Sequence, residues 1–365
     1  MTEPAHSATF EKAIAVTPID ANTYSAFLDP SWCIGLVPHG GYTASVLYRA
    51  AATHFAQRAA TSIKSKRNRP QEPIALQITF QRRTFAGPAI LSVQEIKLGA
   101  RVSTLQVTLL QARDAVAGST THATATSGTA IPDRKDLEVK VLAYVTLSPP
   151  EVEEGPAVTG PWELSPAAPL GSLSGGGIDF GALSAEGVDG EWEAGPLPSP
   201  TLHAAKHMRV CSPASTLRPK TVHERAMQVV DQWAQFAPGG MPARWSNEAV
   251  VYLADIFPAA LDRMGAMEAT RVSRVTDGRD AGEKVGTGEG LVQFWYPTVT
   301  MNIDLKSRLP PQGVEWLHSR VVTRMLRGSR ADLEVLILDQ QEQLVATSTQ
   351  VALVVDPARN GKGRL

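Results

Sequence analysis

The sequence predicts an α+β chain that contains two copies of one unit, each a long helix followed by an antiparallel sheet. Three observations support this prediction. Apolar helix-like runs occupy residues 42–60 and 246–264, one in each half. A series of strand-like runs follows each helix. A stretch rich in Pro, Gly, Ser and Ala, residues 148–221, separates the two halves and shows little periodicity of either kind.

In the first half, Ile74, Leu76, Ile78 and Phe80 alternate with less apolar neighbours, which is the period of a half-buried strand. Further strands are expected at residues 89–98, 101–111 and 115–125. In the second half, Ser246 or Asn247 is suited to cap the helix, and strands are expected at 292–305, 314–326, 332–338 and 344–355.

The two halves also share short stretches of similar sequence. Residues 107–110 and 117–120 read VTLL and AGST, and residues 335–338 and 346–349 read VLIL and ATST. We interpret this as an internal duplication. A long helix wrapped by a curved antiparallel sheet is a hotdog unit, and burial by the sheet explains why both helices are apolar nearly all round. The expected units are residues 1–147 and 222–365, joined by the connector 148–221.

Composition excludes several classes of function. The chain has 365 residues, 43% of them hydrophobic and 19% charged, with a formal net charge of -1. This balance gives no electrostatic reason to expect nucleic acid or an anionic membrane as a partner. No apolar run approaches the length of a spanning helix. The two cysteines, Cys33 and Cys211, have no metal-ligand spacing, so neither a metal nor another cofactor is expected.

The balanced charge, the lack of a long apolar run and the presence of only two cysteines favour a cytoplasmic protein. The last residues, Gly363-Arg364-Leu365, are only weakly similar to a peroxisomal address. The chain is expected to stand alone or to form a homo-oligomer through its sheets, because fused units protect each other's strand edges.

Asp255 is the first candidate for chemistry, because it interrupts an apolar helical stretch and a buried carboxylate is costly without partners. Pro258 is expected to kink or break the helix beside it. A wet helix face or a local cap is the alternative role for this side chain. The Gly40-Gly41 turn is the second candidate, because a helix N-terminus offers amides and glycines allow close approach of a ligand.

Residues 253–261, LADIFPAAL, resemble the catalytic helix of acyl-CoA thioesterase II and the wider thioesterase-like double-hotdog family. Glu315-Trp316 and the run PHGGY at 38–42 are similar to further motifs of that family. The resemblance implies that Asp255, Thr300 and Gln350 together hold a water that attacks an acyl thioester. Standing alone, Thr300 and Gln350 would be ordinary strand residues. The joint pattern makes them candidates.

His39, Gly40, Gly41 and Tyr42 are expected to contact the substrate, an acyl-CoA or an acyl-carrier thioester, because the helix N-terminus at the Gly40-Gly41 turn can stabilise the thioester carbonyl. His39 could instead cap the turn. The first half lacks a triad of its own: the position matching Gln350 is expected near His122, and residues 42–60 contain no acidic residue. One active site per chain is therefore expected. The basic run 64–69 could meet coenzyme A phosphates or simply be a solvated loop.

The predicted function is hydrolysis of acyl thioesters to a free acid and a thiol. The chain departs from the family at residues 304–308, DLKSR, where an aromatic or His-containing run is common, so substrate preference stays open. The alternative is a tailoring enzyme, a cyclase or dehydratase, that acts on a polyketide-like intermediate without hydrolysis. A non-catalytic acyl-binding protein is disfavoured, because buried polar groups without a task cost stability.

Overall fold

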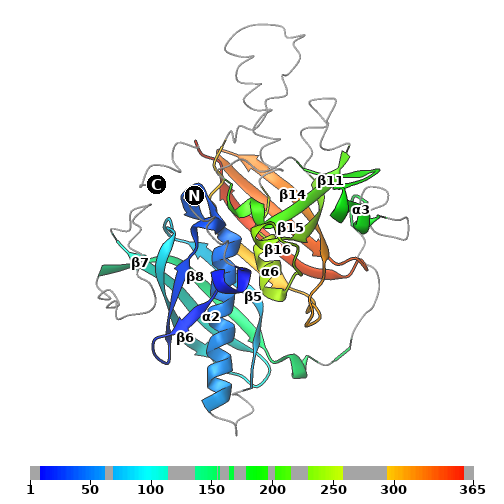
Figure 1. Cartoon of the computed structure of the whole chain (residues 1–365). Coiled ribbons are helices and arrows are strands. Elements are labelled where there is room, and N and C mark those ends of the chain that lie inside the picture. Colours follow the sequence, from blue (N-terminus) through cyan, green and yellow to red (C-terminus); the bar gives the residue numbers. More distant parts are fainter. Residues whose placement is uncertain are drawn as a thin grey trace, which may run out of the picture.

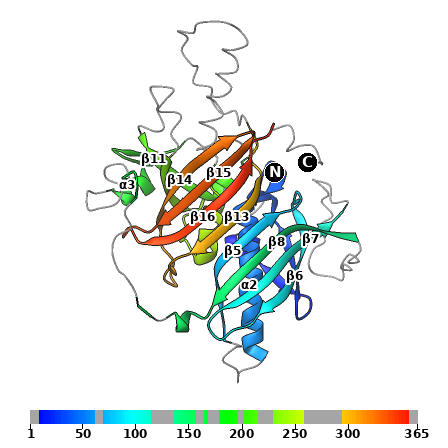
Figure 2. The same ribbon diagram turned by 180° about the vertical axis from the view of Figure 1, so that it is seen from behind.

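A computed structural model of the chain describes residues 9–61, 69–113, 136–153, 155–156, 164–167, 178–195, 202–214, 229–257 and 294–356. In this part of the chain, fourteen strands form one continuous sheet, in the order β1-β2-β6-β7-β8-β5-β13-β16-β15-β14-β12-β11-β10-β9. Figure 2 shows the central strands side by side across both halves. The strands of the first half are β1 (Val16–Pro18), β2 (Thr23–Leu28), β5 (Glu72–Phe80), β6 (Gly87–Lys97), β7 (Ser103–Ala112) and β8 (Leu137–Ser148). Those of the second half are β9 (Val188–Asp189), β10 (Trp192–Ala194), β11 (Met208–Pro213), β12 (Val229–Phe236), β13 (Thr298–Leu305), β14 (Trp316–Arg327), β15 (Arg330–Leu338) and β16 (Leu344–Leu353).

The strand order confirms the predicted duplication. From the junction of β5 and β13, the order outward is β5-β8-β7-β6-β2 on one side and β13-β16-β15-β14-β12 on the other. In chain order, each half therefore runs strand, helix, then four strands with the same pairing, and all these pairs are antiparallel. The halves meet edge to edge where β5 pairs with β13, from Thr79 with Thr300 to Ala75 with Asp304. This is the α+β double-hotdog arrangement.

The first helix agrees closely with its prediction. Helix α2 spans Gly40–Thr61, against the predicted 42–60. It lies across the strands of the first half, with α6 beside it (Figure 1). Its apolar side chains join one hydrophobic core that also contains residues of α6 and of both sets of strands. None of the described helices is long and apolar enough to cross a membrane.

The second helix is shorter than predicted. Helix α6 spans Asn247–Leu253, and the Ser246 side chain caps it by accepting from the Ala249 amide. The backbone then tightens: the Asp255 amide donates to the Tyr252 carbonyl and the Ile256 amide to the Leu253 carbonyl, both three residues back. Asp255 therefore lies in a turn just after the helix, not inside it. Pro258 and the rest of the predicted run to residue 264 lie outside the described residues.

Several strands of the structure, among them β2, β8 and β12, were not predicted. Most predicted strands correspond to β5–β7 and β13–β16, but the run 115–125 lies outside the described residues. The last strand of the first half is β8, which was not predicted. The stretch 148–221 was expected to be a connector, yet it contains α3 (Phe180–Ala185) and strands β9–β11, which extend the sheet beyond β12.

Those added elements help to bury a second apolar cluster at the β12 end of the sheet. Its residues are Leu183, Trp192, Cys211, Trp233 and Trp316. Beside it, the buried Arg320 guanidinium donates to both carboxylate oxygens of Asp231 over 2.8 and 3.0 Å and also to the Pro166 carbonyl. The hydrogen bond from Arg320 to the Pro166 carbonyl holds the segment around Pro166 to the sheet.

Candidate active site

Two glycines let the start of α2 touch the end of α6. A Cβ added to Gly41 would lie 2.5 Å from the Tyr252 carbonyl oxygen and 2.9 Å from the Asp255 Cβ. One added to Gly40 would lie 2.6 Å from Asp255 Oδ2. A side chain at Gly41 would overlap the backbone of Tyr252, and one at Gly40 would displace the Asp255 carboxylate, so the glycines permit the close helix contact at this point. Farther along, the Ser45 hydroxyl donates to the Glu248 carbonyl and Arg49 pairs with the Glu248 carboxylate.

Asp255 is buried at this contact, with 3% of its surface exposed. Its Oδ2 accepts from the Gly41 amide at 2.8 Å, and its Oδ1 accepts from the Thr298 hydroxyl at 3.1 Å. Burial raises the pKa of Asp255 to about 7, although the hydrogen bonds from Gly41 and Thr298 lower it in part. A carboxyl group with this pKa exchanges a proton near neutral pH, as a general base must.

The structure brings Thr298, not the predicted Thr300, to Asp255. The cause is a β-bulge. Thr298 pairs with Ala352 whereas Thr300 pairs with the adjacent Val351, so one extra residue, Val299, lies between them. The bulge reverses the alternation of side chains, and Thr300 therefore lies on the opposite face of the sheet.

Gln350 lies on the core face of β16, buried next to Asp255. It pairs with Met301, which is fully buried, and its own exposed fraction is 2%. Its Nε2 donates to the Ala254 carbonyl at 2.5 Å and to the Ser348 hydroxyl at 3.1 Å. Its Oε1 is buried with no hydrogen-bond partner among the described residues. Such an acceptor is costly unless a ligand or water uses it.

The structure places His39 at the site and Tyr42 away from it. The His39 Nδ1 accepts from the Gly41 amide at 3.1 Å and lies 3.6 Å from Asp255 Oδ2. Burial lowers the pKa of His39 to about 3, so the ring is neutral. The Tyr42 hydroxyl donates to the Ala13 carbonyl at 2.7 Å and accepts from the Asp29 amide at 3.0 Å, which makes Tyr42 a buried tie between segments.

The duplication identifies the counterparts of these residues in the first half. A bulge like that at Thr298 lies between Pro73 and Ala75, so Pro73, which pairs with Leu147, corresponds to Thr298, which pairs with Ala352. Two residues before these partners, Val145 corresponds to Gln350. This corrects the expectation that the match lies near His122, a residue outside the described part of the chain.

The same comparison applies to the helices. His39 immediately precedes α2 as Ser246 precedes α6, and Tyr48 then corresponds to Asp255. The first half thus has a tyrosine, a proline and a valine where the second has a carboxylate, a hydroxyl and an amide. At the first-half position that corresponds to Asp255 there is therefore no carboxylate.

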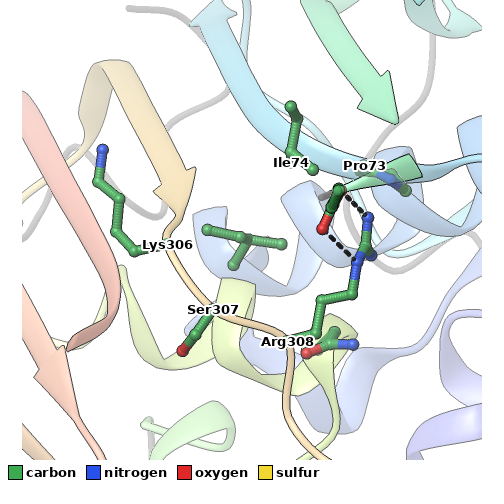
Figure 3. Close-up of a pocket in the computed structure, with 8 residues that line it drawn as sticks. Pro73, Ile74, Lys306, Ser307 and Arg308 are labelled. Atoms are coloured by element: carbon green, nitrogen blue, oxygen red, sulfur yellow. Dashed lines mark hydrogen bonds and ion pairs between the residues drawn. The ribbon is translucent and has the colours of Figure 1, made fainter. Parts of the chain in front are cut away.

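A small pocket lies beside Pro73, the residue that corresponds to Thr298 (Figure 3). Its volume is about 30 Å³, which suits about two water molecules. The pocket is lined by Pro73, Ile74, Glu153, Asn247 and residues 305–308. Arg308 donates to Glu72 over 2.5 Å and to Glu153 over 2.6 and 3.1 Å. The unusual run 304–308 therefore ends in an ion-pair cluster at the seam of the two halves, away from Asp255.

Two of the residues at the site escaped sequence reasoning. Thr298 was missed because a bulge has no reliable sequence signature, and the segment PTVT offers two threonines at alternate positions. Phe80 was assigned only as a strand residue, yet its ring end lies 3.3 Å from the Cβ position of Gly40. Among the described residues, no group of three or more His, Cys, Asp or Glu side chains could hold a metal ion.

Comparison with known proteins agrees with this architecture. Residues 28–128 match the family model "Acyl-CoA thioesterase N-terminal domain", and residues 183–354 match "Acyl-CoA thioesterase C-terminal domain". The second match begins inside the stretch that was expected to be a connector. The thioesterase-like protein TwmA of Talaromyces wortmannii is 31% identical over 365 residues, covering 97% of this chain and 94% of that protein.

Solved structures agree on the fold. A crystal structure described as a candidate thioesterase II from Thermobifida fusca superposes with a TM-score of 0.61 at 18% identity, covering 94% of this chain and 98% of that one. A hot dog protein from Alicyclobacillus acidocaldarius gives 0.60 at 15% identity, covering 95% and 98%. The acyl-CoA thioesterase II TesB2 from Mycobacterium marinum gives 0.52 at 15% identity, covering 96% and 100%. By both matched domains and its double-hotdog fold, the chain belongs to the acyl-CoA thioesterase family.

Proposed function

We propose that the protein hydrolyses acyl thioesters, with Asp255 as the general base that activates water. The observation that carries the proposal is the buried Asp255 carboxylate, held by the Gly41 amide and the Thr298 hydroxyl. Its pKa of about 7 leaves a large ionised fraction at neutral pH and still allows it to take up a proton. Membership of the thioesterase family supports the choice of substrate, either acyl-CoA or an acyl group on a carrier protein.

In the proposed reaction, a water molecule replaces part of the contact around Asp255 and gives it a proton while its oxygen attacks the thioester carbonyl carbon. The free Oε1 of Gln350 would accept the second hydrogen of this water and orient it, while the Thr298 hydroxyl, which donates to Asp255 Oδ1, keeps the carboxylate in place. The C–S bond then breaks, and the proton held by Asp255 passes to the departing thiolate. The products are a free carboxylic acid and a thiol.

The α2 N-terminus would stabilise the oxyanion that forms on the carbonyl oxygen. The Gly41 amide is already shared between Asp255 and His39. The Gly40 end of the helix, with its partial positive charge, is the remaining element for this role. Gly40 contributes by its lack of a side chain, because a Cβ there would fall within 2.6 Å of Asp255 Oδ2.

The test is release of free thiol from a panel of acyl-CoAs of increasing chain length and from one acyl-carrier protein. We expect Asp255→Asn to lose at least a hundredfold in kcat/KM. Asp304→Asn is the matched control, because Asp304 is exposed at the end of β13 and pairs only with Lys306 among the described residues. Equal rates for wild type and Asp255→Asn would refute the role of Asp255.

A second pair of variants separates the structural assignment from the sequence assignment. Thr298→Val removes the hydroxyl that donates to Asp255, whereas Thr300→Val changes the opposite face of the same strand. We expect a loss of about tenfold or more for the first and little change for the second, since one hydrogen bond to a charged group is worth about 1.5–3 kcal/mol. The opposite result would restore Thr300. Absence of thiol release from every substrate would favour the tailoring alternative.

A further inference from the structure

His39 and Asp255 form an unusual pair, because two hydrogen-bond acceptors face one donor. The Gly41 amide donates to Asp255 Oδ2 over 2.8 Å and to His39 Nδ1 over 3.1 Å. The two acceptor atoms are 3.6 Å apart, and both side chains are almost completely buried. Since Nδ1 accepts from an amide, it carries no proton, and the ring proton of the neutral imidazole is on Nε2.

The position of His39 Nδ1 affects the ionised and the protonated forms of Asp255 differently. When Asp255 is ionised, its Oδ2 lone pairs face the Nδ1 lone pair, and one N–H serves both. When Asp255 is protonated on Oδ2, the new O–H can donate to Nδ1 after the two atoms approach by roughly 0.8 Å, and the Gly41 amide then donates to Oδ2 alone. The imidazole therefore disfavours the ionised carboxylate and provides a partner for the protonated one.

The backbone fixes the imidazole in this position. The His39 amide donates to the Trp32 carbonyl at 2.9 Å, and the His39 carbonyl accepts from the Thr43 amide and hydroxyl. The ring packs edge-on against Tyr252, with ring centroids 5.2 Å apart. The titratable groups facing Asp255 in the described residues are His39 and Tyr252, and the neutral donors are Gly41 and Thr298.

We propose that His39 is a positioning residue that stabilises Asp255 in its protonated state, the state formed when water gives up its proton. This inference rests on the proposed function and adds to it the group that sets the base strength of Asp255. No proton has to leave the pair: it stays on the carboxyl group, held toward Nδ1, until the thiolate takes it. A simple helix cap would satisfy the Gly41 amide without affecting Asp255.

The test compares two substitutions across a pH series. His39→Leu removes the acceptor, and we expect the midpoint of the kcat/KM profile to fall by about one pH unit or more, a tenfold change in proton affinity. The plateau rate should also fall by a few fold, because a weaker base accepts a proton less readily. In His39→Asn, the side-chain oxygen can take the place of Nδ1, so the midpoint should stay within a few tenths of wild type.

His203→Gln is the control, since His203 is exposed and its loss should leave the profile unchanged. An unchanged midpoint in His39→Leu, with Asp255→Asn inactive, would overturn this inference while leaving the proposed function intact. Should His39→Leu not fold, the ¹⁵N spectrum of histidine-labelled wild type decides. We expect a neutral Nε2–H ring whose Nδ1 signal moves toward a stronger hydrogen bond as pH falls through 7. A signal that does not change with pH, or that moves equally in Asp255→Asn, would refute the pairing.

Discussion

Asp255→Asn should stabilise the protein at high pH while it abolishes the proposed activity. Burial raises the pKa of Asp255 to about 7 in the folded state, well above the ordinary value of 3.8 for an aspartate. Because the folded pKa is the higher one, the stability linked to this proton is full below about pH 4 and is lost as pH rises through 7. At about 1.4 kcal/mol per unit, the loss above pH 7 is about 4 kcal/mol.

Asparagine has no such proton, so its effect relative to wild type should depend on pH. Its carbonyl can accept from the Gly41 amide, and its NH₂ can donate to the Thr298 hydroxyl, which keeps both existing contacts. Between pH 5 and pH 8 the wild type should lose about 2–3 kcal/mol that the variant keeps. Comparing the stability difference between variant and wild type at pH 8 with the same difference at pH 5 removes any effect of the substitution that does not depend on pH.

The measurement is urea unfolding of both proteins at pH 5 and pH 8, followed by the fluorescence of the seven tryptophans. Asp304→Asn, an exposed change in the same sheet, should show no comparable dependence on pH. If the stability difference between Asp255→Asn and wild type is the same at both pH values, Asp255 is not a buried carboxyl group with a raised pKa. Asp255 would then also be unsuited to act as a general base near neutral pH.

Three further predictions concern the site and its support. The rate kcat/KM of wild type should fall about tenfold per pH unit below pH 7, because only ionised Asp255 can accept a proton; a flat profile from pH 5 to pH 8 would contradict this. Gly41→Ala should cost about 1–3 kcal/mol in thermal or urea unfolding, since its Cβ would overlap the Tyr252 carbonyl, whereas Gly195→Ala, with 3.6 Å to the nearest atom, should cost little. Arg320→Met should cost about 3–5 kcal/mol by leaving the buried Asp231 with only His318, whose Nε2 lies 3.2 Å from its Oδ1, as a side-chain partner, and adding Asp231→Leu should recover most of that loss.

The sequence predicts the repeated unit well, because a buried helix and half-buried strands leave periodic patterns. The α2 prediction differs from the structure by only a few residues. The strands from 188 to 213 were missed for physical reasons. Strands β9 and β10 have two and three residues, too few to show an alternation of side chains, and the six residues of β11 do not alternate between buried and exposed. The helix around Asp255 was overestimated, because an apolar run does not reveal where the backbone tightens into a turn.

At the candidate site, too, the sequence identifies some residues and misses others. Asp255 and Gln350 stand out in sequence because they are polar residues in apolar or strand contexts, and the structure places them next to each other through the Ala254 carbonyl. Thr300 does not join them, because the bulge at Val299 reverses the face. Side-chain direction beyond a bulge depends on how many residues each strand contributes to the pairing, which no pattern within one strand encodes.

The duplication explains why a single chain would have one site of this kind. The two bulges are retained at equivalent positions, so the backbone geometry that turns Thr298 inward is present twice. At the equivalent position in the first half, the side chains of Pro73, Val145 and Tyr48 provide no aliphatic hydroxyl, no side-chain amide and no carboxylate, respectively. Arg308 forms ion pairs with Glu72 and Glu153 where the two halves meet. The two helices differ in a complementary way: α2 begins with the glycines that permit close approach, whereas α6 is followed by the turn that carries the carboxylate of Asp255. Because each half supplies what the other lacks, the site depends on the fused pair, and loss of the α2 glycines should damage it as much as loss of Asp255.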